Sequence, residues 1–276
     1  MRALVFGKGG QLATHLQKKL APDYDYLGIE NLDLTKSSDL SKYLSSHNYE
    51  LIINASAYTA VDKAEEEKDK AFQVNAEAVG IMAMHCKHLI HISTDYVFDG
   101  NKGGAYTEND RPNPLNIYGA SKLAGEKLAL ENNANSIVIR TSWLYSEYGN
   151  NFVKTMLRLG QEKDSLAIVS DQIAAPTYAG DLAQIICKIA SEPQNYKSGI
   201  YHYCSDGKAS WYDFAKEIFR LRNIPMELRP ILTKDYPTPA QRPLYSLLDN
   251  SKIKHDMDIK IPNWQESLKK CLERMS

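Results

Sequence analysis

Residues 3–20 read ALVFGKGGQLATHLQKKL, an apolar run followed by a glycine-rich turn and an amphipathic segment. The four apolar residues at 3–6 are typical of a buried strand. The segment after the turn, through Leu20, predicts an amphipathic helix. Strand, glycine turn and helix in this order indicate the first unit of an α/β fold.

The same alternation continues along the chain. Further strands are predicted at residues 24–29, 51–54, 89–93 and 137–140, and helices at residues 63–86 and 152–159. Parallel neighbours need crossover connections, so strands that alternate with helices predict a parallel sheet. The expected fold class is therefore α/β, with a Rossmann-type doubly wound parallel sheet.

The alternation is less regular after about residue 142. We expect residues 1–145 to form the Rossmann domain and residues 146–276 to form mainly a smaller α/β lobe that covers the crevice. Some later segments are expected to return to the first domain. The elements predicted in the second part are a polar loop at 171–177, a helix at 179–190, a strand at 199–203, and helices at 212–221 and 265–275.

Composition excludes several classes of protein. The 276 residues carry a formal net charge of −1, which argues against a nucleic-acid or anionic-membrane partner. The four cysteines contain no Cys-x-x-Cys pair, so neither a disulfide framework nor a zinc site is indicated. No stretch approaches the ~20 apolar residues of a membrane span, and residues 3–6 are too short for a signal peptide. We expect a cytoplasmic protein that is a monomer or a weak homodimer.

The turn at residues 7–13 has the spacing Gly7-x-x-Gly10-x-x-Ala13. Glycines there allow a tight turn and a close approach of the backbone to a pyrophosphate, and the small third residue permits close packing of helix and strand. The following helix offers free N–H groups and its positive dipole end to the phosphates. Such spacing alone is a weak signal, but between a strand and a helix it predicts a dinucleotide site. Residues 1–145 are therefore expected to bind NAD(P).

Acidic residues follow the second predicted strand. Glu30 lies at about the ~20-residue spacing at which an acid binds the adenosine ribose, although it can also be a solvated strand-end carboxylate. A carboxylate there disfavours a 2′-phosphate, so NADH is slightly preferred, while NADPH and NADH are both plausible cofactors. Asp33 either lies under the adenine or caps a turn.

A second group of candidate residues lies between residues 91 and 122. Thr94 emerges at the carboxyl end of the fourth predicted strand, where open α/β sheets place their ligand crevice. Tyr118 and Lys122 are four residues apart, so they share one face of the helix predicted to begin near them. A hydroxyl, a phenol and an ammonium directed at one crevice predict a site that polarises and protonates a carbonyl.

A Tyr-x-x-x-Lys spacing can also arise by chance, because the chain has 17 tyrosines. A second Tyr-x-x-x-Lys occurs at Tyr212 and Lys216, on a helix in the irregular part and without a strand-end hydroxyl before it. We interpret that copy as a packing tyrosine with a lysine whose stem lies on apolar surface. The position of Tyr118 after Thr94 distinguishes the candidate catalytic pair.

The expected chemistry follows from the pKa of the phenol. Its reference value of ~10 makes tyrosine a slow acid–base catalyst at neutral pH. The ammonium of Lys122, and a positive nicotinamide once hydride has left, would lower the pKa of Tyr118. Lys122 can also bind the ribose of the nicotinamide half, and Thr94 can donate a hydrogen bond to the substrate carbonyl.

Further segments match one known family in the same order along almost the whole chain. They are residues 7–13, 54–65, 93–100, 114–119, 140–143, 149–152, 171–172, 176–177 and 242–243. With the candidate residues above, they resemble the extended short-chain dehydrogenase/reductase superfamily and, more closely, the dTDP-4-dehydrorhamnose reductase family.

The resemblance implies NAD(P)H-dependent reduction of the C4 keto group of dTDP-4-dehydro-L-rhamnose (dTDP-6-deoxy-L-lyxo-4-hexulose) to dTDP-L-rhamnose. This is the last step of dTDP-rhamnose biosynthesis, which serves cell-surface polysaccharides. By motif position, Tyr118 is the proton donor, Lys122 is its partner and Thr94 tunes the site. The implied cofactor-binding residues are Gly7, Gly10, Gln11, Leu12, Glu30, Asp33, Leu34, Ala57, Tyr58, Thr59, Tyr118 and Lys122. The implied substrate residues are Val61, Thr94, Asp95, Tyr96 and Trp143. For Trp143, a packing role as a half-buried aromatic is weighed equally with a role in sugar binding.

One departure from the family concerns a metal. Some members form a dimer around Mg²⁺ through carboxylates on the first helix and after the Pro-Thr loop. The matching positions here are His15 and Gly180, which are not hard oxygen donors. No metal is therefore predicted, and a Mg²⁺-bridged dimer is doubtful.

Other activities on the same scaffold are alternatives. Nucleotide-sugar 4,6-dehydratases place a carboxylate after Thr-Asp to remove the C5 proton, whereas this chain has Tyr96 there. Epimerases use the same Tyr and Lys, but the matches around Trp143 and Asp171 favour a reductase. A sister 4-reductase with other stereochemistry and a non-catalytic NADP-binding subunit, such as the methionine adenosyltransferase β subunit, stay open.

Overall fold

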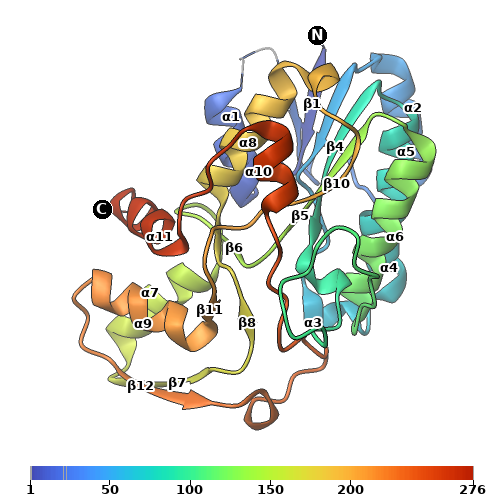
Figure 1. The fold of residues 1–276 in the computed structure, drawn as a ribbon. Helices are drawn as coiled ribbons and strands as arrows, with labels where there is room; N and C mark the ends of the chain where they lie inside the picture. The colour runs from blue at the N-terminus through green and yellow to red at the C-terminus, as the bar shows by residue number, and fades with distance from the viewer. Residues whose placement is uncertain (1, 21, 23, 276) are drawn as a thin grey trace.

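The computed structural model describes residues 2–20, 22 and 24–275, and within them the chain forms two lobes (Figure 1). The larger lobe contains a six-stranded parallel sheet in the spatial order β10-β5-β4-β3-β1-β2. The doubly wound α/β prediction is confirmed. The strands are β1 (Ala3–Phe6), β2 (Asp25–Leu27), β3 (Leu51–Asn54), β4 (His88–Thr94), β5 (Ser136–Thr141) and β10 (Gly199–His202).

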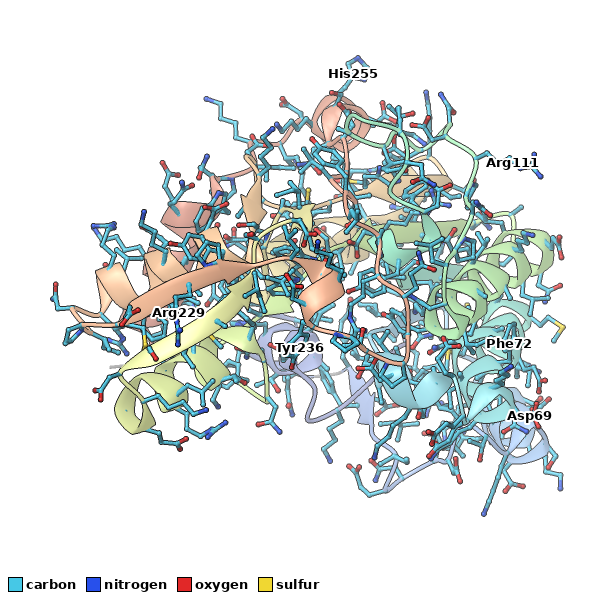
Figure 2. All side chains as sticks on the ribbon, turned by 90° about the horizontal axis from the view of Figure 1, so that it is seen from below. Asp69, Phe72, Arg111, Arg229, Tyr236 and His255 are labelled. Atoms are coloured by element: carbon cyan, nitrogen blue, oxygen red, sulfur yellow. The ribbon has the colours of Figure 1, made fainter. Side chains whose placement is uncertain are left out.

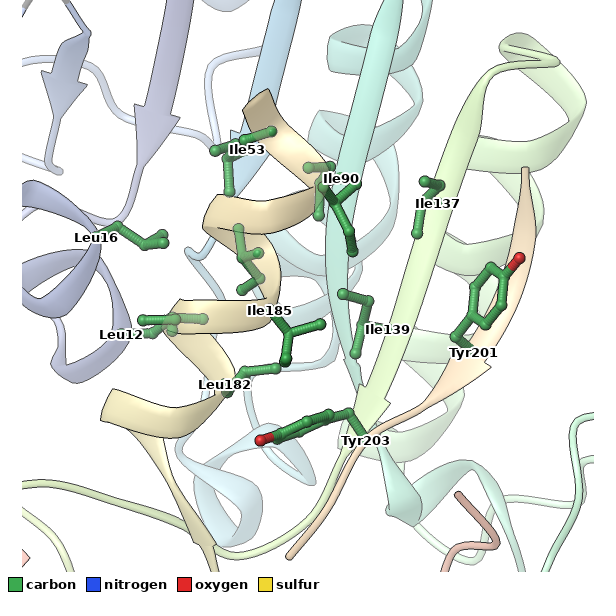
Figure 3. Close-up of a cluster of buried hydrophobic side chains, with 14 of the residues drawn as sticks. Leu12, Leu16, Ile53, Ile90, Ile137, Ile139, Leu182, Ile185, Tyr201 and Tyr203 are labelled. Carbon is green, nitrogen blue, oxygen red and sulfur yellow. The ribbon is translucent and has the colours of Figure 1, made fainter. Parts of the chain in front are cut away.

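Helices cover both faces of this sheet, because successive side chains of a strand point to opposite sides. From β1, Ala3 and Val5 belong to the apolar cluster drawn in Figure 3. Leu4 and Phe6 belong to the cluster on the other face. The helices of the first cluster are α1 (Gln11–Lys19), α8 (Ala179–Ser191) and α10 (Ser251–Met257); those of the second are α2 (Ser37–His47), α5 (Ala78–Met84) and α6 (Ile117–Asn132).

The smaller lobe has its own apolar core, in which Val153, Phe214 and Leu268 pack together. These residues come from three helices: α7 (Phe152–Glu162), α9 (Trp211–Leu221) and α11 (Trp264–Glu273). Two-stranded pairs complete the lobe and its junction with the sheet. They are β7 (Ser165–Val169) with β12 (Glu227–Ile231), β8 (Ile173–Ala174) with β11 (Ala209–Ser210), and β6 (Leu144–Tyr145) with β9 (Thr177–Tyr178).

The two lobes lie at opposite sides of the molecule. Figure 2 shows Arg229 of β12 on one side, and Asp69 and Phe72 of α4 (Lys68–Phe72) on the other. The later segments α8, β10 and α10 pack in the larger lobe, against the sheet that the first half of the chain builds. We propose to retain the division near residue 145, with these three segments assigned to the Rossmann domain.

The continuous helix predicted over residues 63–86 is wrong. The segment divides into α3 (Val61–Ala64), α4, a π-helical turn (Gln73–Glu77) and α5. The π turn lies where Asn75 is buried, with its amide bonded to both backbone groups of Tyr58 and to the Ser121 hydroxyl. A Cβ on Gly125 would lie 2.0 Å from the Asn75 carbonyl oxygen, so α6 packs directly on the bulge. Bulges of this kind mark sites where packing overrides helical regularity.

Other differences from prediction are local. β2 ends at Leu27 rather than residue 29, because the N–H of Gly28 donates to the Asn31 side chain in a turn. The polar loop at 171–177 contains β8 and the first residue of β9. The helices α2 and α10 and the pair β7–β12 were not predicted. Among the described residues, no helix has the length and apolar character needed to cross a membrane.

Candidate active site

A cavity of about 1110 Å³ lies at the carboxyl edge of the sheet. Its lining comes from the turn after β1, the segments after β2 and β3, the end of β4, the start of α6 and the segment after β5. Strand β1 lies between β3 and β2, so the chain changes direction across the sheet at β1. Ligands of open α/β sheets bind at such a switch point.

The glycine turn provides a backbone cradle in this cavity. Gly7 has a φ of +99°, and a Cβ there would lie 2.7 Å from the Ala55 carbonyl oxygen, so only glycine fits. Nothing lies within 4 Å of a Cβ on Gly9, so the turn is open on its outer side. Gly10 is the N-cap of α1, and it has no side chain that could accept hydrogen bonds from the backbone N–H groups of the first turn. These N–H groups at a helix start fit a pyrophosphate.

Most of the predicted cofactor residues line the cavity. Glu30 is exposed and does not line the cavity. Its carboxylate lies beside Gly28, which is part of the lining. Asp33 accepts hydrogen bonds from the backbone N–H and the hydroxyl of Thr35, at 3.0 and 2.8 Å, which lower the pKa of its carboxyl. The predicted residues in the lining are Gly7, Gly10, Gln11, Leu12, Asp33, Leu34, Ala57, Tyr58, Thr59, Tyr118 and Lys122.

Thr94 ends β4 and caps the short 3-10 turn at Asp95–Val97. It is 6% exposed and lines the cavity. Its hydroxyl accepts a hydrogen bond from the Tyr96 backbone N–H at 3.2 Å and donates one to the Asp95 carboxylate at 3.1 Å. Thr94 therefore occupies the predicted strand end, with its hydroxyl proton directed at a neighbouring carboxylate.

Tyr118 is the second residue of α6 and lines the same cavity. Asn116 caps the helix by accepting a hydrogen bond from the Gly119 N–H at 2.8 Å. A Cβ on Gly119 would lie 2.2 Å from the Tyr96 carbonyl oxygen, so this glycine allows α6 to approach the 3-10 turn after β4 closely. The ring of Tyr118 meets that of Tyr96 edge-to-face, with centroids 5.9 Å apart.

The electrostatics of Tyr118 differ from expectation. Burial raises the pKa of Tyr118 to about 12. A hydrogen bond with the Thr94 side chain opposes this shift, and the nearby Asp95 carboxylate adds to it. The expectation that Lys122 lowers the pKa of Tyr118 is wrong for the protein without its cofactor, because burial is the largest effect on this phenol. The phenol therefore stays protonated at neutral pH, the form that a proton donor needs.

Lys122 is 1% exposed, with its ammonium inside the larger lobe. Its Nζ donates to the Ile92 carbonyl oxygen at 2.6 Å and lies 3.4 Å from Nε2 of His91. Burial lowers the pKa of Lys122 to about 8, and the carboxylate of Glu126 opposes this shift. Burial also holds the pKa of His91 well below its usual range, so the imidazole is neutral.

The other predicted substrate residues divide into two groups. Trp143 lines the cavity, whereas Val61, Asp95 and Tyr96 do not. Asp95 is 2% exposed, and both of its carboxylate oxygens have hydroxyl partners. Tyr96 is part-buried and lies near Arg242. The structure therefore brings Thr94, Tyr118, Lys122 and Trp143 together around one cavity, and places Asp95 behind Thr94.

Trp143 has a backbone φ of +45°, in the left-handed region that aromatic residues rarely adopt. Its indole stacks on that of Trp211 with centroids 3.6 Å apart and planes 9° from parallel. The Trp211 N–H donates to the Gln172 side chain at 3.2 Å, and Gln172 donates to the Thr233 hydroxyl at 3.1 Å. The smaller lobe thereby supports the side chain of a residue with a strained backbone at the cavity wall.

The family model described as the RmlD substrate binding domain matches residues 1–276. The dTDP-4-dehydrorhamnose reductase of Aggregatibacter actinomycetemcomitans is 44% identical, over 97% of each chain. The chain belongs to the dTDP-4-dehydrorhamnose reductase family. The resemblance seen in the sequence is thereby confirmed.

Solved structures of the family agree with the fold. A dTDP-4-dehydrorhamnose reductase structure from Clostridium acetobutylicum has a TM-score of 0.94 and 38% identity, covering 100% of this chain and 99% of that one. A second, from Bacillus anthracis in complex with NADP, has a TM-score of 0.93 and 38% identity over 99% of each chain. Family membership confirms the prediction of an oxidoreductase of this type that uses NAD(P)H.

The two positions considered for Mg²⁺ do not fit that ion. His15 is 2% exposed, and its Nε2 lies 3.0 Å from the Ser146 hydroxyl and 3.2 Å from the Glu147 carboxylate. A Cβ on Gly180 would lie 2.5 Å from the Tyr178 ring, so the second position has no room for a carboxylate. Within the described ranges, no group of three or more His, Cys, Asp or Glu side chains could hold a metal.

The sequence analysis assigned no role to several residues that support the site. Ser246 donates to Asp95 from a position 151 residues later in the chain. Trp211 and Gln172 support Trp143, and no local motif connects them. The Asn151 side chain donates to Gln11 on the cavity wall at 3.0 Å, across 140 residues. A covariation signal between such distant positions is what could have identified them.

Proposed function

We propose that the protein reduces the C4 keto group of dTDP-4-dehydro-L-rhamnose to give dTDP-L-rhamnose, the last step of dTDP-rhamnose biosynthesis. NAD(P)H supplies the hydride to C4, and the protein supplies a proton to the C4 oxygen. The observation that carries this proposal is that Tyr118, Thr94 and the glycine turn line one cavity. A cofactor on the turn and a keto group beside the phenol would then share one space.

Tyr118 is the proton donor in this proposal. Its raised pKa keeps the phenol protonated until negative charge develops on the carbonyl oxygen. The side chain is positioned by the start of α6, where the Asn116 cap and the close approach at Gly119 fix the backbone. A donor held in place needs no reorganisation during the reaction.

Lys122 and Thr94 assist on either side of the phenol. With its pKa at about 8, Lys122 is mostly protonated at neutral pH, and its place in the cavity lining suits binding of the nicotinamide ribose. Its positive charge would also favour the phenolate left after proton transfer. Thr94 would donate a hydrogen bond to the carbonyl oxygen and polarise it.

Trp143 would provide an apolar wall for the sugar. One face of its indole is covered by Trp211, and the residue also lines the cavity. The C–H face of a deoxy-sugar suits an aromatic ring. Trp211 then acts through Trp143 as a positioning residue.

Removal of this support is expected to weaken substrate binding. We expect Trp211→Ala to raise the KM for the nucleotide sugar up to about tenfold, since an aromatic pair is worth ~0.5–1.5 kcal/mol. The kcat should change less, and Trp211→Phe should largely restore the KM. Steady-state kinetics test this, with near-ultraviolet circular dichroism to follow the stacked indoles. An unchanged KM after loss of the stacking signal would exclude this role for Trp211.

The activity itself is tested with the purified protein and no partner. We expect oxidation of both NADH and NADPH when dTDP-4-dehydro-L-rhamnose is present, with dTDP-L-rhamnose identified by NMR. Cofactor binding without turnover would contradict the proposal and favour a non-catalytic NADP-binding subunit. A product with the opposite configuration at C4 would instead identify a sister reductase.

A further inference from the structure

A buried carboxyl group lies directly behind the candidate catalytic hydroxyl. Asp95 is 2% exposed, and it follows Thr94 in the 3-10 turn at the end of β4. One carboxylate oxygen accepts from the Thr94 hydroxyl at 3.1 Å, and the other accepts from the Ser246 hydroxyl at 2.5 Å. Ser246 is itself 2% exposed and approaches from a segment far along the chain.

The hydrogen-bonding capacity of Thr94 is limited. A hydroxyl has one proton to donate and two lone pairs that accept. With Asp95 ionised, the Thr94 proton goes to the carboxylate, while the hydroxyl oxygen accepts from the Tyr96 N–H and its remaining lone pair is free for the Tyr118 phenol. An ionised carboxylate can only accept. In that state Thr94 has no proton left for a substrate carbonyl.

A neutral Asp95 changes this arrangement. Its own O–H can donate to the Thr94 oxygen, and its free oxygen still accepts from Ser246. The Thr94 proton is then released from Asp95 and can point into the cavity, which Thr94 lines. The two protonation states of Asp95 therefore correspond to two orientations of the Thr94 hydroxyl.

The surroundings of Asp95 make both states accessible near neutral pH. Burial raises its pKa to about 7, against hydrogen bonds from Ser246, Thr94 and nearby backbone N–H groups. The titratable groups that face it are the phenols of Tyr96 and Tyr118 and the thiol of Cys204. Each is neutral at that pH, since burial raises the pKa of all three.

The cation beside Tyr96 is engaged elsewhere. Arg242 faces Tyr96, and its guanidinium donates to both carboxylate oxygens of Asp62, at 2.9 and 2.7 Å. Arg242 also donates to the Thr238 hydroxyl and the Ala240 carbonyl oxygen. Among the described residues, no cation forms an ion pair with Asp95, so its ionised form lacks a counter-charge.

We propose that neutral Asp95 is a positioning residue, which turns the Thr94 hydroxyl toward the carbonyl oxygen of the substrate. This inference rests on the proposed reduction. It predicts that ionisation of Asp95 withdraws the hydrogen bond that polarises the carbonyl. Reductive kcat/KM is therefore full below the pKa of Asp95 and falls as the pH rises through it.

The test compares pH profiles of kcat/KM for reduction in four proteins. In Asp95→Asn the side-chain amide donates to Thr94 at every pH, so the decline near pH 7 should disappear, at the cost of a severalfold lower rate. In Ser246→Ala the carboxylate loses a stabilising donor, so the decline should move to higher pH. Asp181→Asn is the control for a buried aspartate outside the cavity lining: Asp181 accepts from a serine, Ser267, at 2.7 Å, but its charge is paired with Lys270.

A purely structural role for Asp95 would scale the rate equally at all pH values. An Asp95→Asn profile with the wild-type decline would therefore overturn the inference. So would a folded Asp95→Asn protein that is inactive throughout, because that result would mean that the charge is required. An Asp181→Asn profile shifted like that of Asp95→Asn would also contradict it. Failure of the wild-type protein to turn over would instead reject the proposed function.

Discussion

Replacement of Tyr118 by phenylalanine is expected to lower kcat by ~10²-fold or more, the usual size of an acid–base contribution. The substitution removes only the hydroxyl, so the ring can keep its edge-to-face contact with Tyr96. Cofactor affinity should therefore be nearly unchanged. Steady-state kinetics and NADPH titration measure the two effects separately.

The chain supplies a matched control for this experiment. Tyr212 and Lys216 have the same spacing but lie on α9, and neither lines the cavity. Tyr212→Phe should leave kcat within about twofold of the wild type, because Tyr212 lies outside the cavity lining and the substitution keeps its packing ring. If Tyr118→Phe kept the wild-type kcat, Tyr118 would be excluded as the proton donor.

The largest effect on stability is expected at a buried ion pair behind the site. Glu126 and Arg140 are each 1% exposed and are joined by two hydrogen bonds, at 2.9 and 2.7 Å. The Ser93 hydroxyl also donates to Glu126, at 2.5 Å. Glu126→Ala leaves the guanidinium without its partner, so the free energy of unfolding should fall by ~3–5 kcal/mol. Urea unfolding measures this change.

An exposed pair gives the control for that measurement. Arg158 and Glu162 on α7 are 60% and 49% exposed and lie 2.7 Å apart. Glu162→Ala should cost no more than ~0.5 kcal/mol, because solvent screens such pairs. If Glu126→Ala lowered the free energy of unfolding as little as Glu162→Ala, the expected destabilisation on breaking the buried pair would be wrong.

The sequence predicts the sheet well and the helices less well. Strand β1 is a continuous apolar run, and β3, β4 and β5 each contain a shorter one, as strands buried on both faces do. The break in the helix at 63–86 depends on Asn75, whose partners lie in distant segments. The pair β7–β12 joins strands 62 residues apart in register, which no local pattern records. Tertiary contacts therefore decide what local patterns miss.

The same limit applies to the candidate site. Thr94, Tyr118 and Lys122 are predictable because a strand end and a helical spacing of four define their positions. Glu30 illustrates the opposite case: spacing alone selects it, whereas the turn after β2 leaves it exposed and outside the cavity lining. Burial also reverses the expected pKa shift of Tyr118, and burial is a property of the folded chain.

In the proposed reaction, hydride reaches C4 of a dTDP-keto-sugar while the protein protonates the oxygen. The most direct measurement is turnover with NADPH deuterated at the transferred position, followed by NMR of the nucleotide-sugar product. We expect dTDP-L-rhamnose with deuterium at C4 and nowhere else on the sugar. A product without deuterium at C4, or consumption of the keto-sugar without loss of NADPH absorbance, would contradict it.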